Sequence, residues 1–570
     1  MSSTQTAENR PPRSAATLVV VRDAPAGVEV LLMLRAERGD HNSGAWVFPG
    51  GVVDRRDCDW HGHCHGLDDA VASAQLGVAR GGLDYHVAAL RECFEEAGLL
   101  FAVDANGDAI VDAEALTRLQ DWRTALHRGE RTLGEFCEHA GLRLAVDRLA
   151  YLSHWLTPLG RAKRFDTRFF VAEVPAGQTP LHDGAEMVGH RWMRPADALA
   201  HDDSLKLMGP TRATLAMLTR FDSAQSLMEW ARAPREVPLI MPRIGVGSQG
   251  DRPVMPTEPA WAELGRLDPL GHGHACYDIQ PGVAVRLSPR LIRVTANNGS
   301  VMTGPGTNTY LVGGGERNEW AAIDPGPLDP RHVDAILAAA PGPIRWIFAT
   351  HTHVDHSPAC ALLKQRTGAP VHGRLPAHPE WQDASFAPDR LLAGGERIAL
   401  NDDTTLRAIH TPGHASNHLC YLLEEERTLF TGDHVMQSST VVINPPDGDM
   451  AAYIASLRSL SAEEGEQLEW LAPGHGFLMA QPKRAFDWIV RHRLQREAKV
   501  VDALRDLGPA SVDALLAQVY DDVAAHLHGV AMRSLKAHLF KLRDEGMAAE
   551  MAGLWSLVPS PSGRGRVRAR

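Results

Sequence analysis

The chain lacks any apolar run long enough to cross a membrane as a helix. Such a helix needs about 20 consecutive apolar residues, and no stretch of the 570 residues provides them. The N-terminal residues MSSTQTAENRPPRSAA also lack the apolar core of a secretory signal peptide. We therefore expect a protein with no membrane span and no export signal.

Cysteine is scarce and scattered. The chain has seven cysteines, an odd number, at positions 58, 64, 93, 137, 276, 360 and 420. Disulfide-rich secreted domains instead carry even numbers of closely spaced cysteines. The pattern predicts free thiols and a reducing, cytoplasmic setting.

Basic residues are outnumbered by acidic ones. The chain has 58 Lys and Arg against 70 Asp and Glu, which gives a formal net charge of −12. This balance disfavours nucleic-acid binding over the whole surface, although a local basic patch would still be able to bind it. A chain of 570 residues is expected to form two or more domains.

Changes in composition along the chain indicate six parts. Residues 236–279 are rich in Pro and Gly, which is typical of an interdomain linker. The large regions on either side show no internal repeat, so they are expected to differ in fold. The parts are a disordered N-terminus (1–14), a first α/β region (15–235), the linker (236–279), a second α/β region (280–481), a helical region (482–560) and a disordered basic tail (561–570).

Residue types that can bind metals are concentrated in the segment THTHVDH, residues 350–356. This segment directly follows the apolar, strand-like run WIFA. Four potential ligands within six residues can converge only from a loop, and the end of a strand supplies one. Imidazole and carboxylate groups together suit zinc, or another borderline divalent metal such as manganese or iron.

Three later segments place similar residues in similar positions. TPGH ends at His414, TGDH contains Asp433 and His434, and APGHG contains His475. Each segment is a glycine-containing turn after an apolar run, as expected for loops above a sheet. A single His-x-His pair is usually an exposed or hydrogen-bonded pair, but four such elements in this order predict a metal site.

The order of these segments resembles the metallo-β-lactamase superfamily over roughly residues 280–480. The resemblance implies an αβ/βα sandwich in which two metal ions acidify water for attack on a carbonyl or phosphoryl centre, with Asp355 orienting the nucleophile. His418 and His434 are expected either to hydrogen-bond to ligands or to be exposed. The implied ligands are His351, His353 and His414 for one ion, Asp355, His356 and His475 for the other, and Asp433 as the bridge.

Two further segments resemble one group within that superfamily. Residues 297–310 contain NNGS and GPGTNTY, and residues 482–560 have three helical patterns followed by Leu554-Trp555, which would end a wing. Together they are similar to the lactamase-like proteins with a winged-helix tail, which include a mitochondrial single-strand-specific endoribonuclease and fungal thioesterases acting on carrier-bound polyketides. The winged helix would either contact nucleic acid or only pack. The residues that offer it a basic face are Arg491, Arg493, Arg496 and Lys499.

Three glutamates share one face of a helix expected at about 83–98. In RECFEEAGL, Glu92, Glu95 and Glu96 are spaced at i, i+3 and i+4. An exposed acidic face would explain this spacing, but the preceding Gly50-Gly51 adds a second feature. The two features together resemble the Nudix box, in which a glycine loop precedes such a helix.

The Nudix resemblance extends over about residues 15–200 and implies an α/β/α sandwich that hydrolyses pyrophosphates. By this resemblance Glu92, Glu95 and Glu96 bind magnesium or manganese, Glu95 and Glu96 act in catalysis, and Arg91 braces the box. Residues 31–54 also resemble a Nudix branch that acts on coenzyme A. That branch usually has other residues at the positions of Met33, Ala36 and Asp40.

One departure from the Nudix box is large. Gly51 and Arg91 are 40 positions apart, far more than in the usual box, and we expect the insert to remove the usual intervening glutamate. The insert contains CDWHGHCH, residues 58–65, which would either bind a metal or form an irregular loop.

The sequence therefore predicts a multidomain α/β protein and a bifunctional metal-dependent hydrolase. The second half would hold two zinc ions, or manganese or iron, and the Nudix half magnesium or manganese. Expected substrates are a small-molecule diphosphate or coenzyme A-type compound. Alternatives are an endoribonuclease on single-stranded RNA or an acyl thioesterase in the second half, and a non-catalytic nucleotide-sensing module in the first. A basic channel would favour RNA, whereas an apolar slot beside the metals would favour an acyl thioester.

Overall fold

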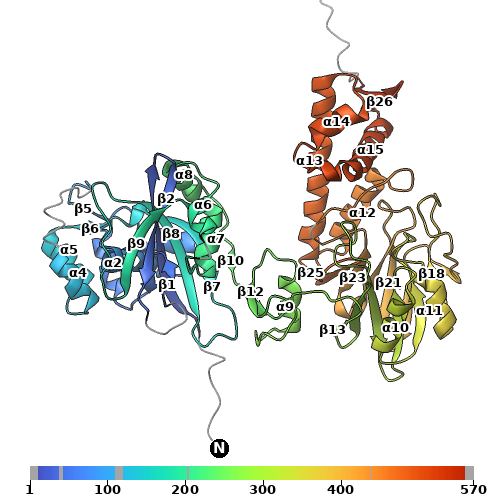
Figure 1. Ribbon diagram of the computed structural model, residues 1–570, viewed down its shortest axis with the longest axis horizontal. Coiled ribbons are helices and arrows are strands. Elements are labelled where there is room, and N and C mark those ends of the chain that lie inside the picture. Colours follow the sequence, from blue (N-terminus) through green and yellow to red (C-terminus); the bar gives the residue numbers. More distant parts are fainter. Residues whose placement is uncertain (1–10, 38–42, 109–119, 202–203, 438, 559–570) are drawn as a thin grey trace, which may run out of the picture. The chain divides into compact units, whose positions relative to one another are not determined.

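The computed structural model describes residues 11–37, 43–108, 120–201, 204–437 and 439–558 (Figure 1). The predicted basic tail, most of the predicted disordered N-terminus and Asp40 lie outside these residues. The chain forms two compact units. One contains the residues up to Ile244 with Asp251–Pro256 and Leu270–His274, and the other contains Gly245–Gly250, Thr257–Pro269 and the residues from Ala275 onward.

The first unit is built on an eight-stranded sheet in the order β10-β7-β8-β1-β2-β3, with β4 paired to β1 and β9 to β2. The strands are β1 (Arg13–Ala24), β2 (Gly27–Arg35), β3 (Trp46–Val47), β4 (Gly50–Val52), β7 (Ala150–Leu156), β8 (Phe165–Glu173), β9 (Met187–Met193) and β10 (Leu239–Ile240). β1 begins one residue before the predicted end of the disordered N-terminus.

The central residues 18–21 of strand β1 are all apolar because both faces of this sheet are covered. Leu18 and Val20 pack into one buried cluster, and Val19 and Val21 pack into another on the opposite face. The first cluster includes α2 (Gly82–Ala97), and the second includes α6 (Pro195–Ala200), α7 (Gly209–Leu218) and α8 (Ala224–Arg232). The unit is an α/β/α sandwich.

The long insert before α2 folds instead of looping out. It forms η1 (Asp57–His63) and α1 (Asp69–Leu76), and Gly82 lets the backbone of α1 approach α2 closely. α2 ends at Ala97 and is capped by Gly98, whose φ of 67° suits glycine. The remaining elements of this unit are β5 (Ala102–Val103), α4 (Gln120–His127), α5 (Leu133–Ala140), β6 (Arg143–Leu144) and η2 (Val146–Arg148).

The segment between the two sandwiches has secondary structure of its own. It contains β11 (Arg243–Gly245), β12 (Arg252–Val254), which pairs with β11, and α9 (Trp261–Leu267). Its residues are divided between the two units, and α9 belongs to the second.

The second unit contains two sheets whose strands follow chain order. The first sheet has β13 (Ala284–Ser288), β14 (Leu291–Thr295), β15 (Asn308–Gly314), β16 (Glu319–Ile323), β17 (Ile344–Phe348), β18 (Val371–Gly373) and β19 (Arg390–Leu391). The second has β20 (Arg397–Asn401), β21 (Thr404–His410), β22 (Leu419–Leu423), β23 (Thr428–Gly432), β24 (Trp470–Pro473) and β25 (Met479–Ala480), with η3 (Glu424–Glu426) between β22 and β23.

The two sheets pack face to face. Tyr310 and Phe348 of the first sheet share a buried cluster with Tyr421 and Phe430 of the second. Helices α10 (Pro330–Ala339) and α11 (Ala359–Thr367) cover the outer face of the first sheet, and α12 (Met450–Glu463) and α13 (Pro482–Leu507) cover that of the second (Figure 1). This is an αβ/βα sandwich.

The C-terminal region forms a winged helix on the far half of α13. It consists of α14 (Val512–Val519), η4 (Ala525–Leu527), α15 (His528–Asp544) and the hairpin β26 (Ala548–Met551) to β27 (Leu554–Leu557). The hairpin turn has positive φ at both Ala552 and Gly553, as two-residue hairpin turns often do. Trp555 fills the buried cluster between the helices.

No helix within the described residues combines the length and the apolar character that crossing a membrane requires.

Candidate metal centre and a second carboxylate site

The loop Thr350–His356 follows the C-terminal end of β17. Asp324 fixes this loop by hydrogen bonds. The Asp324 carboxylate accepts hydrogen bonds from Thr350 N and Thr350 Oγ1, both at 2.7 Å, and lies 2.9 Å from His356 Nδ1. Asp324 is almost fully buried. Sequence reasoning did not single it out, although its position directly after the apolar strand EWAAI matches that of the other loop carboxylates.

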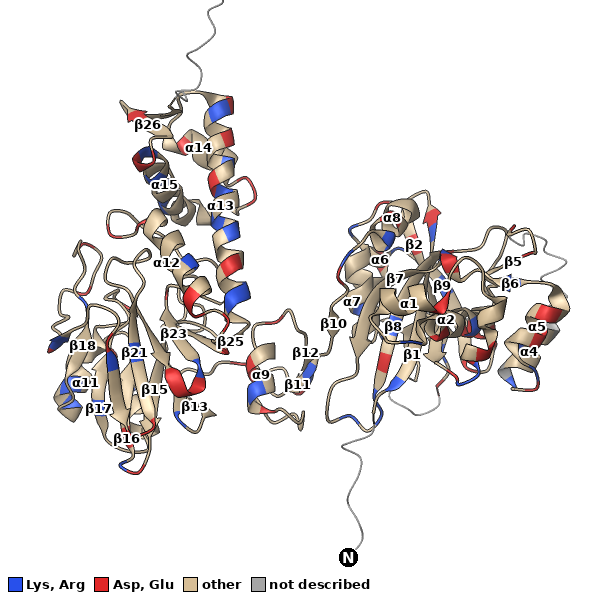
Figure 2. Ribbon diagram, turned by 180° about the vertical axis from the view of Figure 1, so that it is seen from behind, with Lys and Arg blue, Asp and Glu red and all other residues tan. Residues whose placement is uncertain are grey.

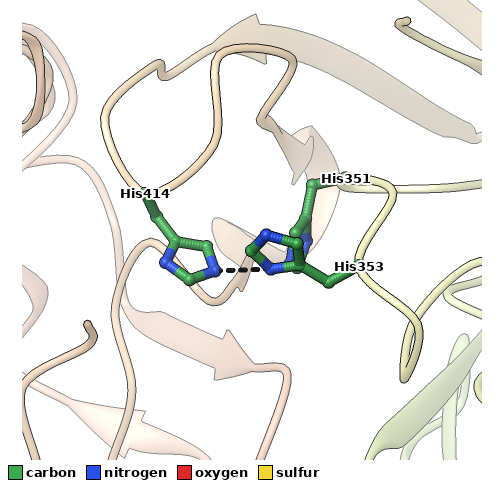
Figure 3. A group of neighbouring side chains, drawn as sticks. All are labelled: His351, His353 and His414. Atoms are coloured by element: carbon green, nitrogen blue, oxygen red, sulfur yellow. Dashed lines mark hydrogen bonds between the residues drawn. The ribbon is translucent and has the colours of Figure 1, made fainter. Parts of the chain in front are cut away.

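Three of the predicted ligands form one group (Figure 3). His351 Nε2 lies 3.0 Å from His353 Nδ1, and His414 Nε2 lies 2.9 Å from the same nitrogen. His414 comes from the loop after β21, so the two sheets contribute to this group together. Burial, reinforced by the neighbouring His414, lowers the pKa of His353 to about 3. The ring is therefore neutral, which is the form that binds metals.

The other four predicted ligands, Asp355, His356, Asp433 and His475, form an adjoining group. His475 Nε2 is 3.2 Å from Asp433 Oδ1 and 3.4 Å from Asp355 Oδ2, and His356 Nε2 is 3.3 Å from Asp433 Oδ1. The second oxygen of Asp433 is 3.7 Å from His414 Nε2. Asp433 therefore lies between the two groups, where the sequence resemblance puts the bridging ligand.

The ligand rings are oriented by hydrogen bonds on their far side. His414 Nδ1 lies 2.8 Å from Val442 O, and His475 Nδ1 lies 3.1 Å from Gly306 O. A ring nitrogen that donates to a carbonyl carries the proton, which leaves the other nitrogen unprotonated and facing the group. The backbone thus selects the tautomer that a metal requires.

The donor set fits divalent metal ions. His356 Nε2, His475 Nε2 and Asp433 Oδ1 are buried, and none has a hydrogen-bond partner within the described part of the chain. Burial alone would lower the pKa of His475, but the Asp433 and Asp355 carboxylates raise it to about 9. The carboxylates therefore favour positive charge at this position. Nitrogen and oxygen donors of this kind bind zinc and similar ions.

His418 and His434 are both fully buried, so the alternative that they are exposed is wrong. His418 Nδ1 lies 2.9 Å from Thr411 Oγ1, and its ring stacks on His351 at 5.1 Å between centroids. His434 packs edge-on against Tyr453. Within the described residues neither ring hydrogen-bonds to a predicted ligand, and neither residue is a member of either group.

A cavity of about 770 Å³ opens beside His475. Its lining is largely apolar and includes Val301, Met302, Met436 and Phe477. Among the described residues that line it, none is Lys or Arg. Such a lining suits an acyl or other apolar group and gives no positive charge to a phosphate chain.

The predicted basic face on α13 is interrupted. Arg493 is buried and donates to Val441 O, Arg496 pairs with Asp522 at 2.7 Å, and Lys499 lies 3.2 Å from Asp521. Figure 2 shows acidic and basic residues alternating along this helix. Two of the four predicted basic residues are therefore paired with carboxylates, and a third is buried.

In the first unit, the Gly50-Gly51 loop packs directly on α2 despite the long insert. Gly50 N donates to Glu96 Oε2 at 2.9 Å. A Cβ at Gly51 would lie 2.4 Å from the Glu92 carboxyl group, so any other residue would have to displace that side chain. Arg91 donates to Glu92 Oε1 at 2.8 Å. The glycine loop and the glutamates thus form one site.

The insert contains no glutamate, in line with the expectation, but Asp57 supplies a carboxylate in its place. Asp57 follows Gly51 by six positions, before the main part of the insert, and accepts from Arg91 Nε at 3.0 Å while almost fully buried. The short spacing from Gly51 was the signal that sequence reasoning missed. A second missed carboxylate is Glu186, which faces α2 from the loop before β9. Burial raises the pKa of Glu96, and Glu92 and Glu186 raise it further.

The His- and Cys-rich insert does not gather ligands. His61 Nε2 pairs with Asp84 at 2.7 Å, and Cys64 is buried among apolar residues. Within the described residues, three or more ligand atoms lie mutually within 4.8 Å only in the two groups of the second unit. The Nudix glutamates are not gathered that closely either.

Comparison with known proteins agrees with this division. Residues 302–475 match the metallo-beta-lactamase superfamily, residues 72–210 match the NUDT19 Nudix domain, and residues 511–555 match the beta-lactamase associated winged helix domain. A NUDIX hydrolase structure from Alicyclobacillus acidocaldarius, 28% identical, covers 38% of this chain and 96% of its own with a TM-score of 0.32.

Two curated relatives match the chain over most of their own length. An atrochrysone carboxyl ACP thioesterase of Aspergillus chevalieri is 32% identical over 47% of this chain and 86% of its own. A beta-lactamase-like protein 2 homolog of Drosophila melanogaster is 30% identical over 46% of this chain and 90% of its own. The chain is a hydrolase that belongs to the metallo-β-lactamase superfamily and joins a Nudix domain, a metallo-β-lactamase domain and a winged helix in that order.

Proposed function

We propose that the metallo-β-lactamase domain hydrolyses acyl thioesters. The observation that carries this proposal is the apolar cavity of about 770 Å³ beside His475, which has no Lys or Arg among its described lining residues. The likeness to a protein named as an acyl-carrier thioesterase supports it. The interrupted basic face of α13 gives no comparable support to cleavage of single-stranded RNA.

The residues of the centre suggest how they would act. His351, His353 and His414 would hold one ion, Asp355, His356 and His475 the other, with Asp433 between them. Two divalent ions in these positions would acidify water and polarise the thioester carbonyl. Asp355 would accept a proton from the attacking water as the C–O bond forms and would pass it to the leaving sulfur as the C–S bond breaks, so that the thiol leaves protonated.

The loop 297–307 holds Asp355 for this role. Thr307 Oγ1 donates to Asp355 Oδ2 at 3.5 Å, and Asn298 fixes Thr307 by accepting from its backbone N at 2.8 Å and donating to its Oγ1 at 2.9 Å. Residues 297–310 are among the segments that resemble the lactamase-like proteins with a winged-helix tail. We infer that the loop aligns Asp355 with the carbonyl that enters from the cavity.

For the Nudix domain we propose hydrolysis of a diphosphate in a nucleotide or coenzyme A-type molecule. The packing of Gly50-Gly51 on Glu92 and Glu96 supports this proposal. Magnesium or manganese held by Glu92, Glu95 and Glu96 would neutralise the diphosphate and activate water. The two proposals also connect chemically, because hydrolysis of an acyl-CoA releases a thiol that carries a diphosphate.

A substrate panel tests both proposals on the purified full chain. The panel contains acyl-CoA, coenzyme A, nucleoside diphosphates and single-stranded RNA, with His353→Ala and Glu95→Gln as reciprocal controls. We expect His353→Ala to lose only thioester hydrolysis and Glu95→Gln only diphosphate hydrolysis. Cleavage of RNA without cleavage of thioesters would overturn the first proposal. Inactivity toward every diphosphate would make the Nudix half a non-catalytic module.

A further inference from the structure

Helix α9 lies in the segment whose composition is that of a linker, yet it carries a buried ion pair into the metallo-β-lactamase sandwich. Glu263 on α9 binds Arg293 on β14 through two hydrogen bonds of 2.7 and 2.9 Å. Both side chains are about 2% exposed. A buried charge is tolerated only when it is paired and hydrogen-bonded, so α9 is anchored in the sandwich.

The same ion pair holds the loop that follows His475. Leu478 N donates to Glu263 Oε2 at 2.8 Å. Arg293 Nη1 donates to Gly476 O at 3.4 Å. The backbone on the C-terminal side of the predicted ligand is therefore fixed by two charged groups, one of which comes from α9.

A second link joins this segment to the same loop. Gln437 donates from Nε2 to Pro259 O at 2.8 Å and accepts at Oε1 from Phe477 N at 2.8 Å. At Gly476 a Cβ would lie 2.7 Å from Gln437 Oε1, and φ is 89°, so glycine is required there. One amide thus connects the chain before α9 to the residues after His475.

The chain after α9 forms part of the cavity wall. Tyr277, Asp278, Ile279, Gln280 and Pro281 line the cavity together with His475. Pro259, just before α9, lines it as well. Both sides of the linker-like segment therefore border the space that the substrate would enter.

We infer that residues 257–269 and 275–281 are a functional part of the hydrolase domain. Glu263 is a positioning residue that holds His475 through Arg293 and the Leu478 amide, and Ile279 helps to set the size of the acyl group. The role of Glu263 does not depend on the substrate, whereas that of Ile279 rests on the proposed thioesterase function.

The positioning role is tested on the full chain with the paired variant Glu263→Leu/Arg293→Met. Replacing both partners by apolar side chains keeps the fold, because such replacements are often neutral or stabilising, but removes the contact to Leu478 N. We expect normal thermal unfolding, about tenfold weaker binding of one of the two metal ions, and a changed Co²⁺ absorption spectrum. Wild-type metal affinity and spectrum in this variant would overturn the inference.

The matched control is Glu426→Gln. Arg266, which lies on α9 like Glu263, donates from Nη2 to Glu426 Oε2 at 2.8 Å. Among the described residues, Glu426 has no hydrogen bond to the His475 loop. This control should keep both metal ions. If the paired variant does not fold, Gln437→Leu removes the second link without disturbing a buried charge, and the same loss of metal affinity is expected. Full metal affinity in Gln437→Leu would then overturn the inference.

The role of Ile279 in the cavity wall is tested by the dependence of kcat and KM on acyl chain length. Ile279→Trp should shift the preference toward shorter acyl groups, and Ile279→Ala toward longer ones, with metal content unchanged. Val283→Trp, at a site that is half exposed and outside the cavity lining, should leave the preference unchanged. An unchanged preference in both Ile279 variants would overturn this part. If the wild type cleaved no thioester, the proposed function would fail while the metal test on Glu263 still stood.

Discussion

At the scale of single residues, burial and close packing favour cation binding by the histidines of the candidate metal centre. His351 and His414 are buried, and His353 Nδ1 lies within 3.0 Å of both. We expect the intact protein to hold about two transition-metal ions per chain. His353→Ala should lower that number and abolish thioester hydrolysis.

Elemental analysis of the wild type and His353→Ala checks this expectation. His526→Ala serves as the control, because His526 is an exposed histidine in the winged helix. Diphosphate hydrolysis should persist in both variants, since the glutamates lie in the other unit. Unchanged metal content in His353→Ala would contradict the ligand assignment.

The carboxyl group of Glu95 makes cation binding in the Nudix domain depend on pH. Burial raises its pKa from 4.5 to about 7, against the opposing charge of Arg91. A carboxyl must lose its proton to bind a cation, so the affinity for Mn²⁺ should rise up to about pH 7 and then level off. The folded protein also keeps this proton where the unfolded chain has lost it. Stability without metal should therefore fall as pH rises from 4.5 to about 7.

Mn²⁺ titrations followed by electron paramagnetic resonance, on protein whose other centre is filled with zinc, measure this affinity. Glu95→Gln should bind weakly at every pH. Glu130→Gln, at an exposed position in the same unit, should behave as the wild type. A wild-type affinity that does not change with pH would rule out Glu95 as a ligand.

Asp57 gives a further prediction at this scale. It accepts hydrogen bonds from the partly buried Arg91 at 3.0 and 3.2 Å. Asp57→Asn removes the negative partner and should destabilise the Nudix domain by roughly 1–3 kcal/mol, with a loss of diphosphate hydrolysis. Thermal unfolding and activity measure both effects. Asp59→Asn, two residues away and exposed, should change neither; equal behaviour of the two variants would refute the bracing role.

At the scale of elements, α13 belongs to two cores. Its first half places Phe486 and Ile489 in the cluster on the second sheet, whereas Val500 and Leu504 belong to the winged-helix cluster. Arg493 lies between the residues of the two clusters, where it is buried and donates to Val441 O. The two halves of one helix therefore have different structural roles.

Truncations separate these roles. A chain that ends at Ala498 keeps Phe486, Ile489 and Arg493 and should retain a folded, metal-loaded sandwich that cleaves small thioesters. A chain that ends at Gln481 loses two large buried side chains and should be several kcal/mol less stable, because removing each costs about 2–5 kcal/mol. Thermal unfolding and elemental analysis distinguish them. Equal stability of the two chains would show that α13 does not contribute to the sandwich.

At the scale of the whole molecule, the two units have separate cores, and each proposed site lies within one unit. We propose that the hydrolase domain begins near residue 245, before α9, and not at the end of the Pro- and Gly-rich segment. A fragment 245–570 should be soluble and bind metal. A fragment 276–570 lacks Glu263 and leaves Arg293 buried and unpaired, which should destabilise it by about 3–5 kcal/mol.

Expression of both fragments, followed by thermal unfolding and metal analysis, provides the measurement. Wild-type metal content in 276–570 would show that the chain before Ala275 is only a connection. Aggregation of 245–570 would instead indicate that the hydrolase domain needs the Nudix unit in order to fold.

The sequence alone determined the order of the domains and the candidate ligands of the metal centre. The candidate metal ligands follow strands in short motifs, and helical spacing puts Glu92, Glu95 and Glu96 on one face. Both patterns involve residues close together in the chain, so the sequence alone reveals them. Only the tertiary structure revealed Asp324 beneath the ligand loop, the burial of Arg493 and the pairing of Glu263 with Arg293. Each of these depends on contacts between residues far apart in the chain. In the sequence, Glu263 is an ordinary charged residue in a Pro- and Gly-rich segment, and folding alone brings it to the loop of His475.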